Sequence, residues 1–107
     1  MIYVTVSKNE AGMYDCIRMK GHAGYAERGQ DIVCAAVSAL LINTVNSIEQ
    51  FTSDQFQYEQ EEKNDQVVFR LVSDISSETK LLMDSLVLGL QAIEETYDRE
   101  YIRVTFQ

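Results

Sequence analysis

Two residue types capable of covalent and acid–base chemistry lie in one segment of this chain. His22 is the only histidine, and Cys34 follows it after eleven intervening residues. A thiolate is a strong nucleophile, and a nearby imidazole can accept the thiol proton and later return it to a leaving group. If the fold brings the two side chains together, the pair is suited to acyl transfer to sulfur.

Asp31 stands directly before an apolar pattern with helical spacing, which predicts a helix over residues 32–53. Asp31 is therefore expected to be its N-cap, and a role in orienting His22 is the alternative. Cys34 would then occupy the third helical position, where unpaired amides and the helix dipole lower the pKa of a thiol. On this interpretation, the backbone N–H of Cys34 is also the natural oxyanion donor.

The connection between the two reactive residues is rich in glycine, with Gly21, Gly24 and Gly29. Glycine permits backbone angles closed to other residues, so a mobile loop able to open and close over a substrate is expected. Tyr25 on this loop is a candidate for contact with apolar substrate side chains. On the helix, Ser38 and Leu41 share the flank of the apolar stripe with Cys34, and they are further candidates.

A structural interpretation of the same residues stands beside the catalytic one. Cysteine is among the most buried residue types, so Cys34 could be a small core residue, and His22 could be a solvated loop residue. Cys34 lies off the main apolar stripe, which favours a functional role. Cys16 has no base or helix end nearby in sequence, so it is expected to be structural.

Composition limits the classes of protein that this chain can represent. It has 107 residues, 46% of them hydrophobic, which predicts one packed domain over residues 1–107. The net charge of −8 argues against nucleic-acid binding and favours a basic protein partner. Two cysteines and one histidine suggest neither a disulfide framework nor a metal site, and no cofactor is implied. No membrane-spanning stretch or secretory signal is expected, so a cytoplasmic location is predicted.

Apolar residues alternate with polar ones in several short segments, the period of a half-buried strand. Strands are predicted at residues 2–7 and 14–20, a hairpin at 56–71 with its turn at 63–65, and a final strand at 102–106. A second helix begins after Ser76 or Ser77 and ends near Tyr97. Its apolar residues cover more than one stripe, so we expect burial on two sides or use in self-association. The predicted fold is α+β, a mostly antiparallel sheet of about five strands with both helices on one face, in the order ββαββαβ.

Two short segments carry a recognisable pattern, separated by the glycine-bearing loop. They are Gly21-His22-Ala23 and Gly29-Gln30-Asp31-Ile32-Val33-Cys34-Ala35-Ala36-Val37-Ser38. Together they resemble the signature of the ribosomal-processing cysteine proteases called Prp. Weaker similarity extends to residues 44–48, 90–97 and the closing strand, whereas the hairpin at 56–71 contributes little.

This resemblance implies a specific activity. Proteins of the family remove a short N-terminal extension from a large-subunit ribosomal protein, the twenty-seventh in the usual naming. Their nucleophile and base fall on Cys34 and His22 here. The resemblance also implies a homodimer and a loop that orders around the substrate peptide. Two alternatives remain at this point: a non-catalytic acidic module or chaperone for a basic ribosomal protein, and a thiol switch through Cys16 and Cys34.

Overall fold

The computed structural model describes residues 1–21, 28–97 and 101–107, without the side chains of residues 28–31 and Glu62. Its elements follow the predicted order ββαββαβ, with one added turn of 3-10 helix. They are β1 (Ile2–Lys8), β2 (Tyr14–Lys20), α1 (Arg28–Phe51), β3 (Phe56–Glu61), η1 (Glu62–Asn64), β4 (Gln66–Leu71), α2 (Ser77–Tyr97) and β5 (Ile102–Phe106).

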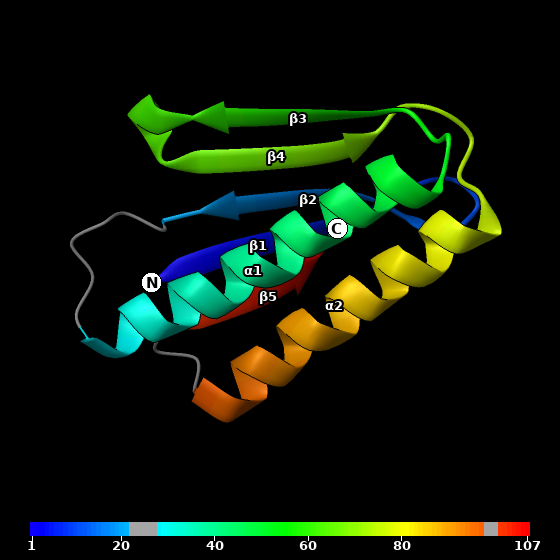
Figure 1. Cartoon of the computed structure of the whole chain (residues 1–107). Helices are drawn as coiled ribbons and strands as arrows, with labels where there is room; N and C mark the ends of the chain where they lie inside the picture. Colours follow the sequence, from blue (N-terminus) through cyan, green and yellow to red (C-terminus); the bar gives the residue numbers. More distant parts are fainter. Residues whose placement is uncertain (22–27, 98–100) are drawn as a thin grey trace.

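The five strands form one sheet in the order β3-β4-β2-β1-β5. The β1–β2, β2–β4 and β3–β4 pairs are antiparallel, and only β1 and β5 run parallel. The parallel pair arises because the chain crosses the sheet through α2 before it returns as β5 (Figure 1). The prediction of a mostly antiparallel sheet of about five strands is confirmed.

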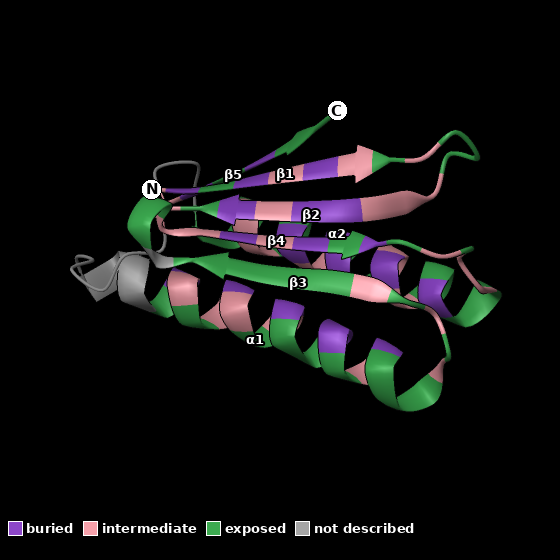
Figure 2. Ribbon diagram, turned by 90° about the horizontal axis from the view of Figure 1, so that it is seen from above, coloured by how far each residue is buried: buried purple, intermediate pink, exposed green. Residues whose placement is uncertain are grey.

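Both helices lie on the same face of the sheet, as predicted (Figure 1). The strand residues facing them alternate with exposed ones, so Ile2, Val4 and Val6 of β1 are fully buried. In Figure 2 the buried parts of α1 and α2 are turned toward the sheet, and β3 is exposed along most of its length. The core therefore lies between one sheet face and two helices, and the other sheet face has no helical cover within the described residues.

The two helices are joined at one end by hydrogen bonds around Asp54. Ser76 caps α2, because its Oγ accepts a hydrogen bond from the N–H of Thr79 at 3.2 Å. Asp54 Oδ2 in turn accepts hydrogen bonds from the N–H of Ser76 at 2.8 Å and from its Oγ at 2.9 Å. Desolvation raises the pKa of Asp54, but hydrogen bonds from Thr79 and Ser76 outweigh it, so the pKa is lowered.

The start of α1 differs from the prediction. The helix begins at Arg28, so Asp31 is its fourth residue rather than its N-cap, and Gly29 belongs to the helix rather than to a flexible loop. Glycine weakens a helix interior by only about 1 kcal/mol relative to alanine, a cost that packing further along the helix readily offsets. The helix therefore extends one turn beyond its apolar pattern.

No stretch was expected to be long enough to cross a membrane, and that expectation was wrong. The part of α1 from Ile32 to Phe51 spans 20 residues with a mean hydropathy of 1.6, so its length and composition alone would allow it to cross a membrane. One side of it is nevertheless buried against the sheet, through Val33, Val37 and Ile48. Its apolar character is thus used, at least in part, to form the protein core.

Candidate active site

Cys34 lies in the second turn of α1, between two residues that anchor the helix. Val33 and Val37 are fully buried and hold this part of α1 against the core. Cys34 itself is half-buried and packs against the same core. It is neither sealed inside the protein nor joined to Cys16 in a disulfide. A side chain in this position combines a fixed backbone with partial access from outside.

The early start of α1 changes two expectations for Cys34. As the seventh residue of the helix, it lies beyond the first turn, where the helix dipole and unpaired amides act on a charge. Its backbone N–H is also paired with a carbonyl four residues earlier, as in any helix interior. The helix end therefore does not explain thiolate stabilisation, and the N–H of Cys34 is not an oxyanion donor.

The charged residues of α1 lie toward its two ends. From Ile32 to Ile48 the sequence contains no Asp, Glu, Lys or Arg, and Glu49 is the first charged residue after Cys34. Before Cys34, Asp31 precedes it by three positions, and Arg28, six positions away, is the only cationic residue in the sequence of α1.

Gly21 fixes the point at which the chain leaves the sheet toward His22. Its φ of 94° lies in the left-handed region that favours glycine. A Cβ atom there would overlap the carbonyl oxygen of Met1, and the N–H of Gly21 donates to the carbonyl of Asp65 at 3.1 Å. Gly21 was expected to contribute to a flexible loop, but the structure shows it held by backbone on two sides.

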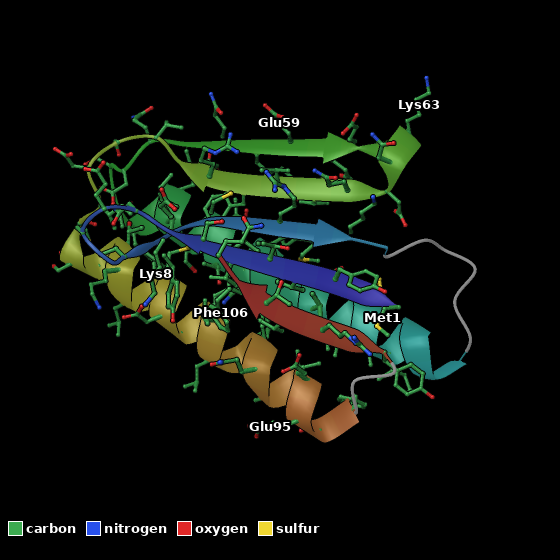
Figure 3. The ribbon with its side chains drawn as sticks, turned by 180° about the vertical axis from the view of Figure 1, so that it is seen from behind. Met1, Lys8, Glu59, Lys63, Glu95 and Phe106 are labelled. Atoms are coloured by element: carbon green, nitrogen blue, oxygen red, sulfur yellow. The ribbon has the colours of Figure 1, made fainter. Side chains whose placement is uncertain are left out.

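The end of β2 and the start of α1 lie at the same end of the molecule (Figure 1). Met1 lies there too, where β1 and β5 begin (Figure 3). The segments that flank the residues between Gly21 and Arg28 are therefore both fixed to the core. His22, Gly24 and Tyr25 lie outside the described residues, so their predicted roles remain predictions.

The two other helical candidates differ in their access to a substrate. Ser38 is half-buried, one turn beyond Cys34. Leu41 is only 2% exposed and belongs to the core, so it is not available for the predicted contact with a substrate. The apolar helical spacing that includes Leu41 therefore reflects burial in the core.

Cys16 and the acidic groups offer no competing site among the described residues. Cys16 is buried in β2, which agrees with a structural role. Within residues 1–21, 28–97 and 101–107, no three His, Cys, Asp or Glu side chains come together in a way that could hold a metal ion. Cys34 is therefore the best-placed reactive side chain in the described part of the protein.

A half-buried cysteine on a core-anchored helix, preceded in sequence by the only histidine, provides the residue types that a cysteine hydrolase uses as nucleophile and base. The sequence model of a family described as Cysteine protease Prp matches residues 1–103. The chain belongs to this family of cysteine proteases.

Relatives agree with this assignment over their full length. The Ribosomal processing cysteine protease Prp of Staphylococcus aureus is 35% identical over 107 residues, covering all of both chains. The crystal structure of Prp from S. aureus in complex with a substrate peptide is similar to this structure with a TM-score of 0.91, 34% identity and full coverage of both chains. A second crystal structure, in complex with a covalently linked product peptide, has a TM-score of 0.86 at the same identity and coverage.

Proposed function

We propose that this chain is a ribosomal-processing endopeptidase that removes the N-terminal extension of a large-subunit ribosomal protein, the twenty-seventh in the usual naming. The observation that carries the proposal is the match of residues 1–103 to the protease family, together with the half-buried position of Cys34 within that match. The full-length relative from S. aureus is named for ribosomal processing, and its structure was solved with a substrate peptide.

In the proposed mechanism, Cys34 is the nucleophile and His22 is the general base. His22 accepts the thiol proton, the sulfur attacks the scissile carbonyl carbon, and the C–N bond breaks as His22 returns the proton to the leaving amine. Water then hydrolyses the thioester and regenerates the thiol. A covalently linked product peptide on the S. aureus relative supports a covalent step of this type.

Because Cys34 lies beyond the first turn of α1, His22 has a second task in this mechanism. Its imidazolium form is the countercharge that stabilises the thiolate. We assign the oxyanion donors to the backbone amides of residues 28–31, the first turn of α1. The first-turn N–H groups of an α-helix have no acceptor within the helix and can therefore donate to an oxyanion. Asp31 belongs to that turn, where a carboxylate stabilises the start of a helix, and we assign it the further role of orienting the His22 segment.

The net charge supports the proposed substrate, and exposed apolar residues on α2 support the proposed homodimer. A net charge of −8 favours the approach of a basic ribosomal protein. Leu81 and Leu88 on α2 are 70% and 69% exposed, and a homodimer would cover them. We further propose a cytoplasmic location, where ribosomal proteins are made and processed.

The test is cleavage of a peptide that spans the extension and the mature N-terminus, followed by mass spectrometry of the products. The wild-type chain should give two products with one cut. Cys34→Ser and Cys34→Ala should reduce the rate by at least about a thousandfold without loss of fold, because the nucleophile is gone. Cys16→Ser is the matched control and should retain most of the activity. Normal turnover by Cys34→Ala, or no cleavage by the wild type, would refute the proposal.

A further inference from the structure

A pocket of about 290 Å³ lies between α1 and the edge strand β3. Val45 and Phe56 form its inner part, because Val45 is buried and Phe56 packs against the core. Ile42 and Tyr58 are 50% and 40% exposed, so apolar surface remains open to solvent at its rim. Asn46 and Glu49 complete the lining. We call this pocket, together with the outer edge of β3, the α1–β3 groove.

The groove and Cys34 share one side of α1. With 3.6 residues per turn, Val45 lies three turns beyond Cys34 and about 20° from it around the helix axis. Ser38 lies about 40° from Cys34 in the same direction, and Ile42 about 80°. At 1.5 Å per residue, Ile42 and Val45 are about 12 and 16 Å along the helix from Cys34. A continuous flank of α1 thus leads from the nucleophile to the groove.

The strand that forms the other wall has a backbone edge suited to bind an extended peptide. β3 is the first strand in the sheet order, so within the described residues no strand pairs with its outer edge. Phe56 and Tyr58 pair with the buried Leu71 and Phe69 and therefore face the helices. An extended peptide that added to β3 would place every second side chain on this face, over the pocket.

The alternate residues of β3 are Gln57, Glu59 and Glu61, which face away from the helices. Glu59 and Glu61 are exposed, and Figure 3 shows Glu59 extending outward from β3. The other side chains of an added peptide would lie beside these carboxylates. Glu49 adds a third carboxylate at the pocket itself. The groove therefore suits a peptide in which apolar residues alternate with basic ones.

We infer that the α1–β3 groove binds the part of the substrate peptide that lies about four to five residues from the scissile bond, as a strand added to β3 with apolar side chains in the pocket. The separation follows from the 12 to 16 Å along α1 and a rise of about 3.3 Å per extended residue. This inference rests on the proposed function, since it assigns a specificity site to the same peptide. It makes the sequence remote from the cut a determinant of cleavage.

The experiment compares a long substrate peptide, about eight residues on each side of the cut, with a short one of about two residues on each side. Ile42→Asp and Tyr58→Ser remove apolar surface from the groove. Each should lower kcat/KM for the long peptide about tenfold or more through KM, while the short peptide is cleaved as by wild type. Phe51→Asp is the matched control, because Phe51 is 75% exposed and lies on the opposite side of α1 from Ile42.

A charge test addresses the second half of the inference. Glu59→Lys with Glu61→Lys should weaken binding of the long peptide to the Cys34→Ala protein, measured by fluorescence anisotropy, and the loss should shrink at high salt. Equal effects of the groove variants on both peptides, or none on either, would overturn the inference while cleavage itself stands. If the wild type cleaves neither peptide, the proposed function and this inference both fail.

Discussion

Gly21 approaches the carbonyl of Met1 so closely that a Cβ atom on Gly21 would overlap the Met1 oxygen. The contact joins the residue that follows β2 and precedes His22 to the first residue of the chain. Because Gly21 also donates to the carbonyl of Asp65, the chain has little freedom at this point. The position of Gly21, the residue directly before His22, is thus determined by backbone contacts rather than by side-chain packing.

Gly21→Ala is predicted to impair both stability and catalysis. The left-handed backbone alone costs an alanine about 1–2 kcal/mol, and the overlap with Met1 adds to that or shifts the strand end. Gly12→Ala is the matched control, because Gly12 also has a positive φ, of 79°, but has open space around its Cβ position. Urea unfolding should show the larger loss for Gly21→Ala. Where both variants are folded, kcat should fall only in Gly21→Ala; equal kcat values would contradict the positioning role.

His22→Ala is predicted to change how Cys34 reacts with pH. Cys34 lies beyond the first turn of α1, where the helix end does not stabilise a thiolate, so the proposed His22 imidazolium is assigned as the source of enhanced reactivity at low pH. Iodoacetamide kinetics of the wild type should therefore show reaction well below the ordinary thiol pKa of about 8.5. In His22→Ala the profile should move up to the ordinary range. A profile unchanged by the substitution would show that another group activates Cys34.

The sequence was sufficient to predict most of the fold, for a clear physical reason. Alternation in β1 and β4 is dictated by a sheet with one covered face, so the pattern of burial in these strands is local in the sequence. Ser76, one of the two predicted caps, caps α2, and the helix extends to Tyr97, near the predicted end. The sheet order was not predictable, because β1 pairs with β5 through contacts about 100 residues apart.

The candidate active site was harder to predict from the sequence than the fold was. Asp31 satisfies the composition rule for an N-cap, yet it also suits the first turn of a helix that begins at Arg28, and sequence cannot distinguish these positions. The α1–β3 groove depends on tertiary packing of Phe56 and Tyr58 beside α1. The only local signal for it was the helical spacing that places Ile42 and Val45 on the flank occupied by Cys34.

Asp54→Asn is predicted to destabilise the protein in a pH-dependent way. The folded-state pKa of Asp54 is lowered, so its carboxylate contributes stability that is fully present above the unfolded value of about 3.8 and is lost as pH falls through the folded value. Chemical unfolding of wild type and variant should differ most near neutral pH and converge as the pH falls below the lowered folded-state pKa of Asp54. In a Ser76→Ala background, Asp54→Asn should lower the free energy of unfolding by a smaller amount, because the hydrogen bond from Ser76 Oγ to Asp54 is already absent. A difference that is constant with pH would contradict this assignment.

Leu81 and Leu88 are predicted to lie in the interface of the proposed homodimer. They are separated by seven residues, close to two helical turns, so both project from one side of α2, and both are largely exposed. The buried residues of α2 lie on one side of the helix, so the alternative of burial on two sides is not met, and we propose self-association as the role of these leucines. Replacing both with Lys should shift the sedimentation of the chain from dimer to monomer at micromolar concentration, while Val72→Lys, at another exposed apolar site, should not. A double variant that remains dimeric would place the interface elsewhere, and a monomeric wild type would refute the homodimer.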